Sequence, residues 1–153
     1  MNDLDTTLAA HPFCEGLAPH LVDTLAGFAS YAAFPAGTWL ARTGTAAGVF
    51  HLVVAGRAGI EVAAADRAPL VVATAHAGDV IGWSWFVEPH LWHFDVIALD
   101  DLRTIVIDGG LLRDACVADH ELGYHVARRL TRVVASRLEA ARHQLVDVYG
   151  HAR

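Results

Sequence analysis

Lysine is absent from this sequence, and arginine supplies every positive charge apart from histidine. Eleven arginines face seventeen acidic residues, which leaves a net charge of −6 at pH 7. The arginines between residues 128 and 142 form a local basic stretch, but Glu121 and Glu139 dilute it and arginines on one helix usually form its solvated face. Because nonspecific binding to nucleic acid needs a broad basic surface, nucleic acid is not an expected partner.

Long hydrophobic runs are also missing. No apolar stretch reaches the roughly 18 residues that cross a bilayer, and the acidic start, with Asp3 and Asp5, lacks the basic-then-apolar order of a secretion signal. We therefore expect no membrane partner and a cytoplasmic location. Cysteine is scarce, and Cys14 and Cys116 lie far apart outside any CxxC motif. Both are predicted to be free thiols.

The sequence lacks the signatures of an enzyme. Ser84 stands between two tryptophans and not in a G-x-S-x-G nucleophile elbow. There is no phosphate-binding P-loop sequence and no dinucleotide-binding fingerprint. We expect neither catalysis nor a bound cofactor.

A single domain, 1–153, with three parts is indicated by the residue periodicity. Leucines recur at helical spacing through residues 4–32, which predicts a helical N-terminal segment, 1–33. Glycines then separate short β-branched and aromatic runs as far as residue 108, the pattern of an all-β roll or barrel. The predicted strands lie at 39–40, 49–54, 59–62, 70–73, 96–99 and 103–107. Helical spacing returns in residues 109–149.

The last predicted helix, roughly 120–149 with Asp119 as its N-cap, has more apolar surface than a small barrel can cover. Packing against the same helix of a second copy would bury the excess. We therefore expect a homodimer. The predicted dimerisation residues are Leu130, Val134, Leu138, Ala141 and Leu145. The alternative is a helix that lies wholly on its own barrel.

Three phrases carry a resemblance to a known family. Residues 34–44 look like an "f-x-x-G-x-x-L-x-x-x-G" opening, residues 49–58 resemble a "y-x-i-x-x-G-x-v" strand pair, and residues 77–82 are similar to an "x-G-D-x-x-G" turn. In this order and spacing they resemble the cyclic-nucleotide-binding domains, including the sensor half of catabolite-activator and fumarate-nitrate-type regulators. The resemblance implies a mainly β fold: a jelly-roll β-roll with N-terminal helices and a long C-terminal helix. Such regulators normally continue into a helix-turn-helix domain. Because this sequence ends at Arg153, we expect a stand-alone form without a DNA-binding domain.

The resemblance also implies a phosphate-binding cassette, in which backbone N–H groups and a short helix N-terminus approach the cyclic phosphate. In the family a glutamate follows the cassette glycine and an arginine pairs with the phosphate. Here Trp83 follows Gly82, Trp92 falls about where the arginine is expected, and the cassette contains no arginine. Ordinary cAMP binding is therefore not expected.

The altered cassette has two main interpretations. Its tryptophans either fill the vacated pocket or line a pocket for an apolar or planar ligand. The candidate ligand-binding residues are Gly82, Trp83, Ser84, Trp85, Trp92, His93 and Asp95. A metal held by the cluster of His90, His93 and Asp95, or haem held by a histidine such as His51 or His76, is a minor alternative. In function, the sequence predicts either a sensor that signals through its long helix to a partner protein, or a ligand-free adaptor.

Overall fold

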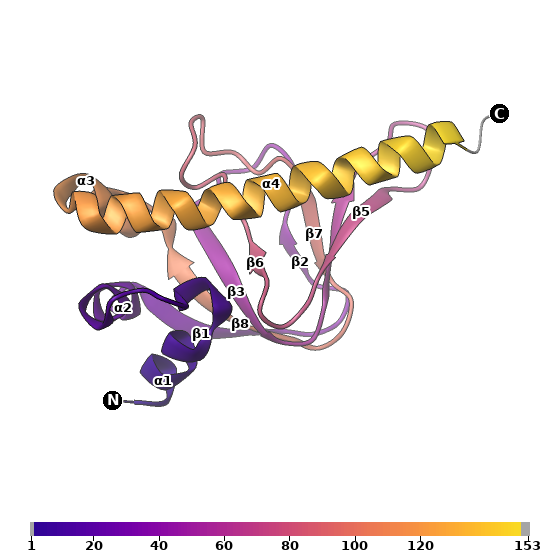
Figure 1. Ribbon diagram of the computed structural model, residues 1–153. Coiled ribbons are helices and arrows are strands. Elements are labelled where there is room, and N and C mark those ends of the chain that lie inside the picture. Colours follow the sequence, from indigo (N-terminus) through magenta and orange to yellow (C-terminus); the bar gives the residue numbers. More distant parts are fainter. Residues whose placement is uncertain (1, 151–153) are drawn as a thin grey trace.

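The computed structural model describes residues 2–150, apart from the side chains of residues 148 and 149. Residues 1 and 151–153 of the expected domain lie outside the described part. Two four-stranded antiparallel sheets form a roll, with the N-terminal helices at one end and a long helix laid across it (Figure 1). This is the predicted fold class. The elements in order are α1 (Asp3–Ala10), η1 (Pro12–Cys14), α2 (Pro19–Ala26), β1 (Ala29–Phe34), β2 (Trp39–Ala41), β3 (Val49–Ala55), β4 (Ala58–Val62), β5 (Leu70–Ala75), β6 (Val80–Ile81), β7 (Asp95–Ala98), β8 (Leu102–Asp108), α3 (Gly109–Ala118) and α4 (His120–Gly150).

The sheets have the strand orders β1-β8-β3-β6 and β2-β7-β4-β5. Apolar side chains from both sheets fill the roll, including Val53, Ile60, Ile81 and Trp92. A second core lies where the first sheet meets the helices, and it includes Phe50. Each sheet therefore helps to bury a continuous core, as the alternation of short apolar strands predicts.

One boundary of the predicted N-terminal segment is wrong. The helical spacing continues in the sequence to residue 32, but α2 ends at Ala26 and strand β1 begins at Ala29. Strand β1 pairs with β8 from Ala29–Ile107 to Phe34–Leu102. Pairing with β8 satisfies the backbone groups of an alanine-rich run whose local propensity favours helix.

The C-terminal helices begin at aspartates. The Asp108 carboxylate accepts the N–H of Leu111 at 2.9 Å at the start of α3. The Asp119 carboxylate accepts the N–H groups of Glu121 and Leu122 at 3.1 and 3.3 Å at the start of α4. Asp119 is therefore the N-cap that the sequence predicts.

Helix α4 carries two apolar stripes. Leu122, Val126 and Leu130 are buried in the core between helices and sheet, with Leu130 only 3% exposed. Val134, Leu138 and Leu145 are 37%, 69% and 57% exposed. At roughly 100° per residue, these three lie about 40–80° around the helix from Leu130. Leu130 packs within its own chain, which corrects its assignment to a dimer interface, whereas the second stripe is accessible.

Candidate functional site

The cassette spans residues 82–95, between the end of β6 and the start of β7. It is built of turns, in which the Phe86 N–H donates to the Trp83 carbonyl at 3.1 Å and the Val87 N–H to the Ser84 carbonyl at 3.3 Å. No part of residues 82–94 forms a helix. The helix N-terminus that the family resemblance implies for phosphate binding is therefore missing from this loop.

Trp92 closes the cassette over its glycine. Gly82 has φ of +105°, a backbone conformation that side chains rarely adopt. A Cβ added to Gly82 would lie 2.7 Å from Cη2 of Trp92. The Trp92 ring is buried in the core of the roll. The glycine that brings backbone close to a phosphate in the family here brings it close to an indole.

Trp83, Ser84 and His93 form the second half of the closure. The rings of Trp83 and His93 stack with centroids 4.7 Å apart. The Oγ of Ser84 lies 3.0 Å from Nδ1 of His93, within hydrogen-bond distance. Ser84 is buried, so its hydroxyl is used inside the loop and is not presented to solvent.

Trp85 points away from the cassette. Its ring stacks on Phe50 with centroids 4.7 Å apart and lies in the core beneath the helices. A Cβ on Gly109, the first residue of α3, would lie 2.6 Å from Trp85, so this glycine permits the close packing. Trp85 is therefore a core residue and does not join the predicted ligand site. Its Nε1 is buried without a hydrogen-bond partner among the described residues.

The carboxylate of Asp95 makes contacts that stabilise the roll. Its carboxylate accepts the N–H of Thr43 at 2.7 Å and lies 3.6 Å from Nε of Arg42. These contacts hold the 42–45 turn against β7. Asp95 does not line the small cavity of the cassette.

The remaining cassette cavity has a volume of about 10 Å³. A cavity needs at least about 10–15 Å³ to hold one water molecule, so this space cannot accommodate a nucleotide as it stands. Of the predicted residues, the structure brings Gly82, Trp83, Ser84, Trp92 and His93 together here. Arg137 of α4 reaches the same cavity and was not predicted, because the sequence places it among the arginines of a solvated helix face.

Burial in the interior of the roll removes enough solvent from one histidine to change its ionisation. His51, on β3 beside Ile81, is buried, and burial lowers its pKa to about 4. Its Nδ1 lies 3.1 Å from Oγ1 of Thr104. Burial also lowers the pKa of His11, against the hydrogen bond to the Val53 carbonyl, which raises it. Both rings are therefore neutral at pH 7 and serve the fold.

The metal alternative finds no support in the described residues. Across residues 2–150, no three histidine, cysteine, aspartate or glutamate side chains lie together as a metal site would require. The cluster of His90, His93 and Asp95 is therefore not assembled. Within the same residues, no helix has the length and apolar character needed to cross a bilayer.

Comparison with known proteins decides the family. The sequence model of the family described as cyclic nucleotide-binding domain matches residues 32–119, more than half of the chain. The chain belongs to the cyclic nucleotide-binding domain family. No curated protein matches the sequence.

Solved structures of this family share the fold. A Geobacter metallireducens GS-15 protein described as cyclic nucleotide-binding is 19% identical, with a TM-score of 0.79 over 90% of this chain and 99% of that one. The N-terminal domain of a Streptomyces coelicolor transcriptional regulator is 17% identical, with a TM-score of 0.69 over 88% and 94%. A regulatory subunit of a cAMP-independent protein kinase A from Trypanosoma cruzi, bound to guanosine, is 24% identical, with a TM-score of 0.72 over 95% and 49%.

Proposed function

We propose that this protein is a regulatory domain that does not bind cAMP in the way typical of its family, and that it is not an enzyme. The observation that carries the proposal is the cassette cavity of about 10 Å³, closed by Trp92 over Gly82 and by the stacked rings of Trp83 and His93. A nucleotide would have to displace these rings before it could reach the backbone of the cassette.

The lost polar contacts add to this obstruction. The family resemblance assigns a glutamate and an arginine to the positions of Trp83 and Trp92. A hydrogen bond to a charged group contributes about 1.5–3 kcal/mol. Losing both costs on the order of 3–5 kcal/mol, which corresponds to about two to four decades of affinity. We therefore place cAMP affinity well outside the micromolar range.

Calorimetric titration with cAMP, cGMP and guanosine tests this proposal. The native protein should give no saturable heat with either cyclic nucleotide up to about 1 mM. The double variant Trp83→Glu/Trp92→Arg restores the family's two polar groups and should gain measurable cAMP affinity, whereas Trp39→Arg, which places an arginine on β2 outside the cassette, should not. Circular dichroism checks that each variant folds.

Micromolar cAMP binding by the native protein would overturn the proposal, whatever the variants do. Guanosine is included because the Trypanosoma cruzi relative is bound to it. Saturable binding of guanosine without cAMP binding would leave the proposal intact and identify a nucleoside sensor.

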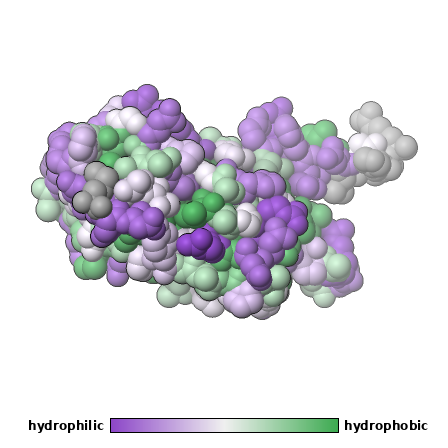
Figure 2. Space-filling view, turned by 90° about the horizontal axis from the view of Figure 1, so that it is seen from below, coloured by the Kyte–Doolittle hydropathy of each residue, from purple (hydrophilic) through white to green (hydrophobic). Residues whose placement is uncertain are grey.

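We further propose that the domain is a homodimer through the second stripe of α4, Val134, Leu138 and Leu145. These side chains recur at the heptad-like spacing of a two-helix contact, with Ala141 between them. On the face seen from below, opposite α4, hydrophobic residues are scattered among hydrophilic ones (Figure 2). Exposed apolar side chains aligned along one helix are a candidate dimer contact.

Sedimentation velocity tests the dimer. The native protein should sediment as a dimer at micromolar concentration, and Leu138→Asp should shift it to a monomer. Val117→Asp is the matched control, because Val117 is 73% exposed but lies on α3, away from the stripe. A native monomer, or equal effects of the two variants, would contradict the assignment.

A ligand-free adaptor is the second candidate function, and the filled cassette is the observation that favours it. An adaptor acts only through its surface, so no small molecule should change its melting temperature. A cytoplasmic location fits either function, because Cys14 and Cys116 are free and buried.

A further inference from the structure

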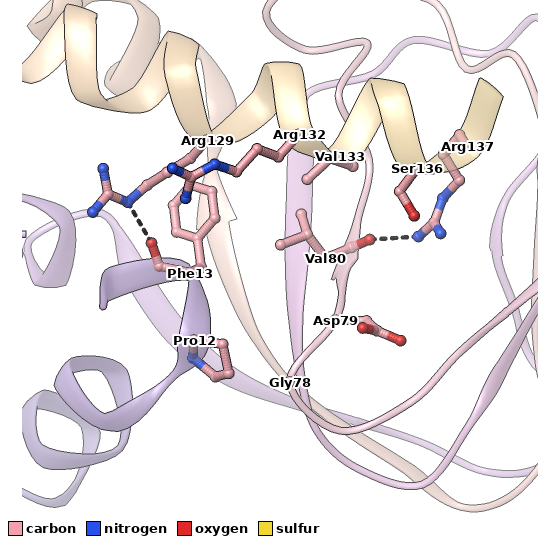
Figure 3. A pocket seen from close by; sticks show the side chains of 10 residues that line it. All are labelled: Pro12, Phe13, Gly78, Asp79, Val80, Arg129, Arg132, Val133, Ser136 and Arg137. Carbon is pink, nitrogen blue, oxygen red and sulfur yellow. Dashed lines mark hydrogen bonds between the residues drawn. The ribbon is translucent and has the colours of Figure 1, made fainter. Parts of the chain in front are cut away.

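A second hollow lies outside the roll, beneath α4. It has a volume of about 220 Å³ and is open to solvent on one side. Its floor comes from η1, through Pro12 and Phe13, and from the turn between β5 and β6, through residues 78–80. Its roof is α4, from which Arg129, Arg132, Ser136 and Arg137 extend into it (Figure 3). We call this hollow the arginine pocket.

The arginine pocket concentrates positive charge in an acidic protein. Three of its lining side chains are guanidinium groups, and a single carboxylate, that of Asp79, faces them. Part of the Asp79 carboxylate is already used, because it accepts the N–H of His76 at 2.8 Å. The pocket therefore has an excess of positive charge, while the whole chain has a net charge of −6.

Two of these guanidinium groups are held in place by uncharged acceptors. Arg129 donates from Nε to the Phe13 carbonyl at 2.6 Å and from Nη2 to the Glu15 carbonyl at 2.7 Å. Arg137 donates from Nη2 to the Val80 carbonyl at 2.7 Å. Carbonyl groups orient a guanidinium without cancelling its charge, so both side chains are preorganised and still cationic.

The third guanidinium is unused. Within the part of the chain that the structure describes, which leaves out the side chains of residues 148 and 149, Arg132 makes no hydrogen bond or ion pair. Burial lowers the pKa of Arg137, and the negative charge of Asp79 opposes this shift. In Figure 3 the Ser136 hydroxyl lies on the same side of the pocket as the Arg137 guanidinium, and the guanidinium groups of Arg129 and Arg132 lie at the opposite end, where Phe13 is. At the Phe13 end of the pocket, the guanidinium group of Arg132, with that of Arg129 at the same end, supplies charged N–H donors suited to a phosphate group.

We propose that the arginine pocket binds a phosphate group, either inorganic phosphate or the phosphate of a small ester, with Arg132 as its main contact. The apolar floor of Phe13 and Val80 accommodates the carbon portion of an ester. The pocket contacts η1, the turn that leads into the cassette, and α4. A bound phosphate would therefore fasten α4 to the roll, independently of whether the cassette binds a nucleotide.

Isothermal titration with inorganic phosphate and with glycerol 3-phosphate, in a phosphate-free buffer, tests the proposal. We expect saturable binding of at least one probe, with one site per chain. Arg132→Gln should weaken it about ten-fold or more, the loss of one charged hydrogen bond. Arg128→Gln is the matched control on the neighbouring turn, because Arg128 lies outside the pocket, and it should leave the affinity unchanged.

The two probes separate the sources of the phosphate. Tighter binding of glycerol 3-phosphate assigns the pocket to a phosphate ester, and equal or tighter binding of phosphate assigns it to the free ion. Three results would overturn the proposal: no saturable binding of either probe up to about 10 mM, equal weakening by Arg132→Gln and Arg128→Gln, or tighter binding of succinate than of both phosphates. Arg132 is exposed and makes no structural hydrogen bond, so its variant should fold normally.

Discussion

The two hollows of this domain differ in what occupies them. In the cassette, two tryptophans and a histidine leave about 10 Å³, and the loop has no cationic side chain near Gly82. Beneath α4 the hollow is about 220 Å³ and three arginines line it. Arg137 lines both. The comparison teaches that a family fold can keep its overall architecture and the cassette glycine while its cationic groups lie on a different element.

The largest expected loss of stability comes from substituting Trp85, the cassette tryptophan that lies in the core. Trp85→Ala should destabilise the protein by about 3–5 kcal/mol, because it removes a fully buried ring stacked on Phe50. Trp85→Phe retains an aromatic ring and removes the unpartnered Nε1, so it should cost clearly less. Urea denaturation measures both. Equal losses for the two variants would contradict the assignment of Trp85 to the core stack.

Removing the Trp92 ring should destabilise the protein by a similar amount, and a ligand that fills the cavity should restore part of the stability. Trp92→Ala should cost about 3–5 kcal/mol and leave a cavity above Gly82. Because the cavity walls are largely apolar, indole should bind there and raise the melting temperature of the variant but not of the native protein. Trp39→Ala is the control, since Trp39 is exposed on β2 outside the cassette cavity, with the Arg42 guanidinium over its ring. An equal response to indole in the native protein would mean that the cassette is already open.

The burial of His51 in the roll predicts that the stability of the protein depends on pH. The pKa of His51 is about 4 in the folded protein, against 6.5 for an ordinary histidine. Between these values the unfolded chain binds a proton that the folded chain does not, so stability is lost as the pH falls from about 6.5 towards 4. The loss attributable to His51 is on the order of 3 kcal/mol. The lowered pKa of His11 acts in the same direction.

Denaturation at a series of pH values measures this slope. His51→Gln, which retains a polar group for Thr104, should reduce it and leave the part due to His11. The exposed His76 provides the control His76→Gln, which should leave the slope unchanged. An unchanged slope in His51→Gln would show that water reaches the interior of the roll.

The smallest effect tests the contact between Gly82 and Trp92. Gly82→Ala places a side chain at φ of +105° and 2.7 Å from the indole, so we expect a loss of about 1–3 kcal/mol. In the Trp92→Ala background only the backbone strain remains, and the loss should shrink. A double-mutant cycle measures the difference. Purely additive losses would mean that Trp92 does not close over this glycine.

The sequence was sufficient for the fold and for part of the site. Glycine spacing predicts six of the eight strands, all but β1 and the two-residue β6, and Asp119 predicts the start of α4, because turns and caps are local. Strand β1 was missed because an alanine-rich run is extended only through its pairing with β8. The sequence assigns Trp85 to the ligand site, whereas the structure places it in the core. Turns give no regular residue periodicity from which the direction of a side chain could be predicted. The arginine pocket joins residues 12–13, 78–80 and 129–137, and no local pattern indicates that these segments meet.

The closed cassette is tested most directly by NMR on protein labelled with ¹⁵N-tryptophan. Its four indole N–H signals, assigned by single substitutions, report separately on Trp39, Trp83, Trp85 and Trp92. We expect no saturable movement of the Trp83 and Trp92 signals with cAMP up to about 1 mM. Saturable shifts of these two signals at micromolar cAMP, with Trp39 unmoved, would contradict the account and place a nucleotide in the cassette.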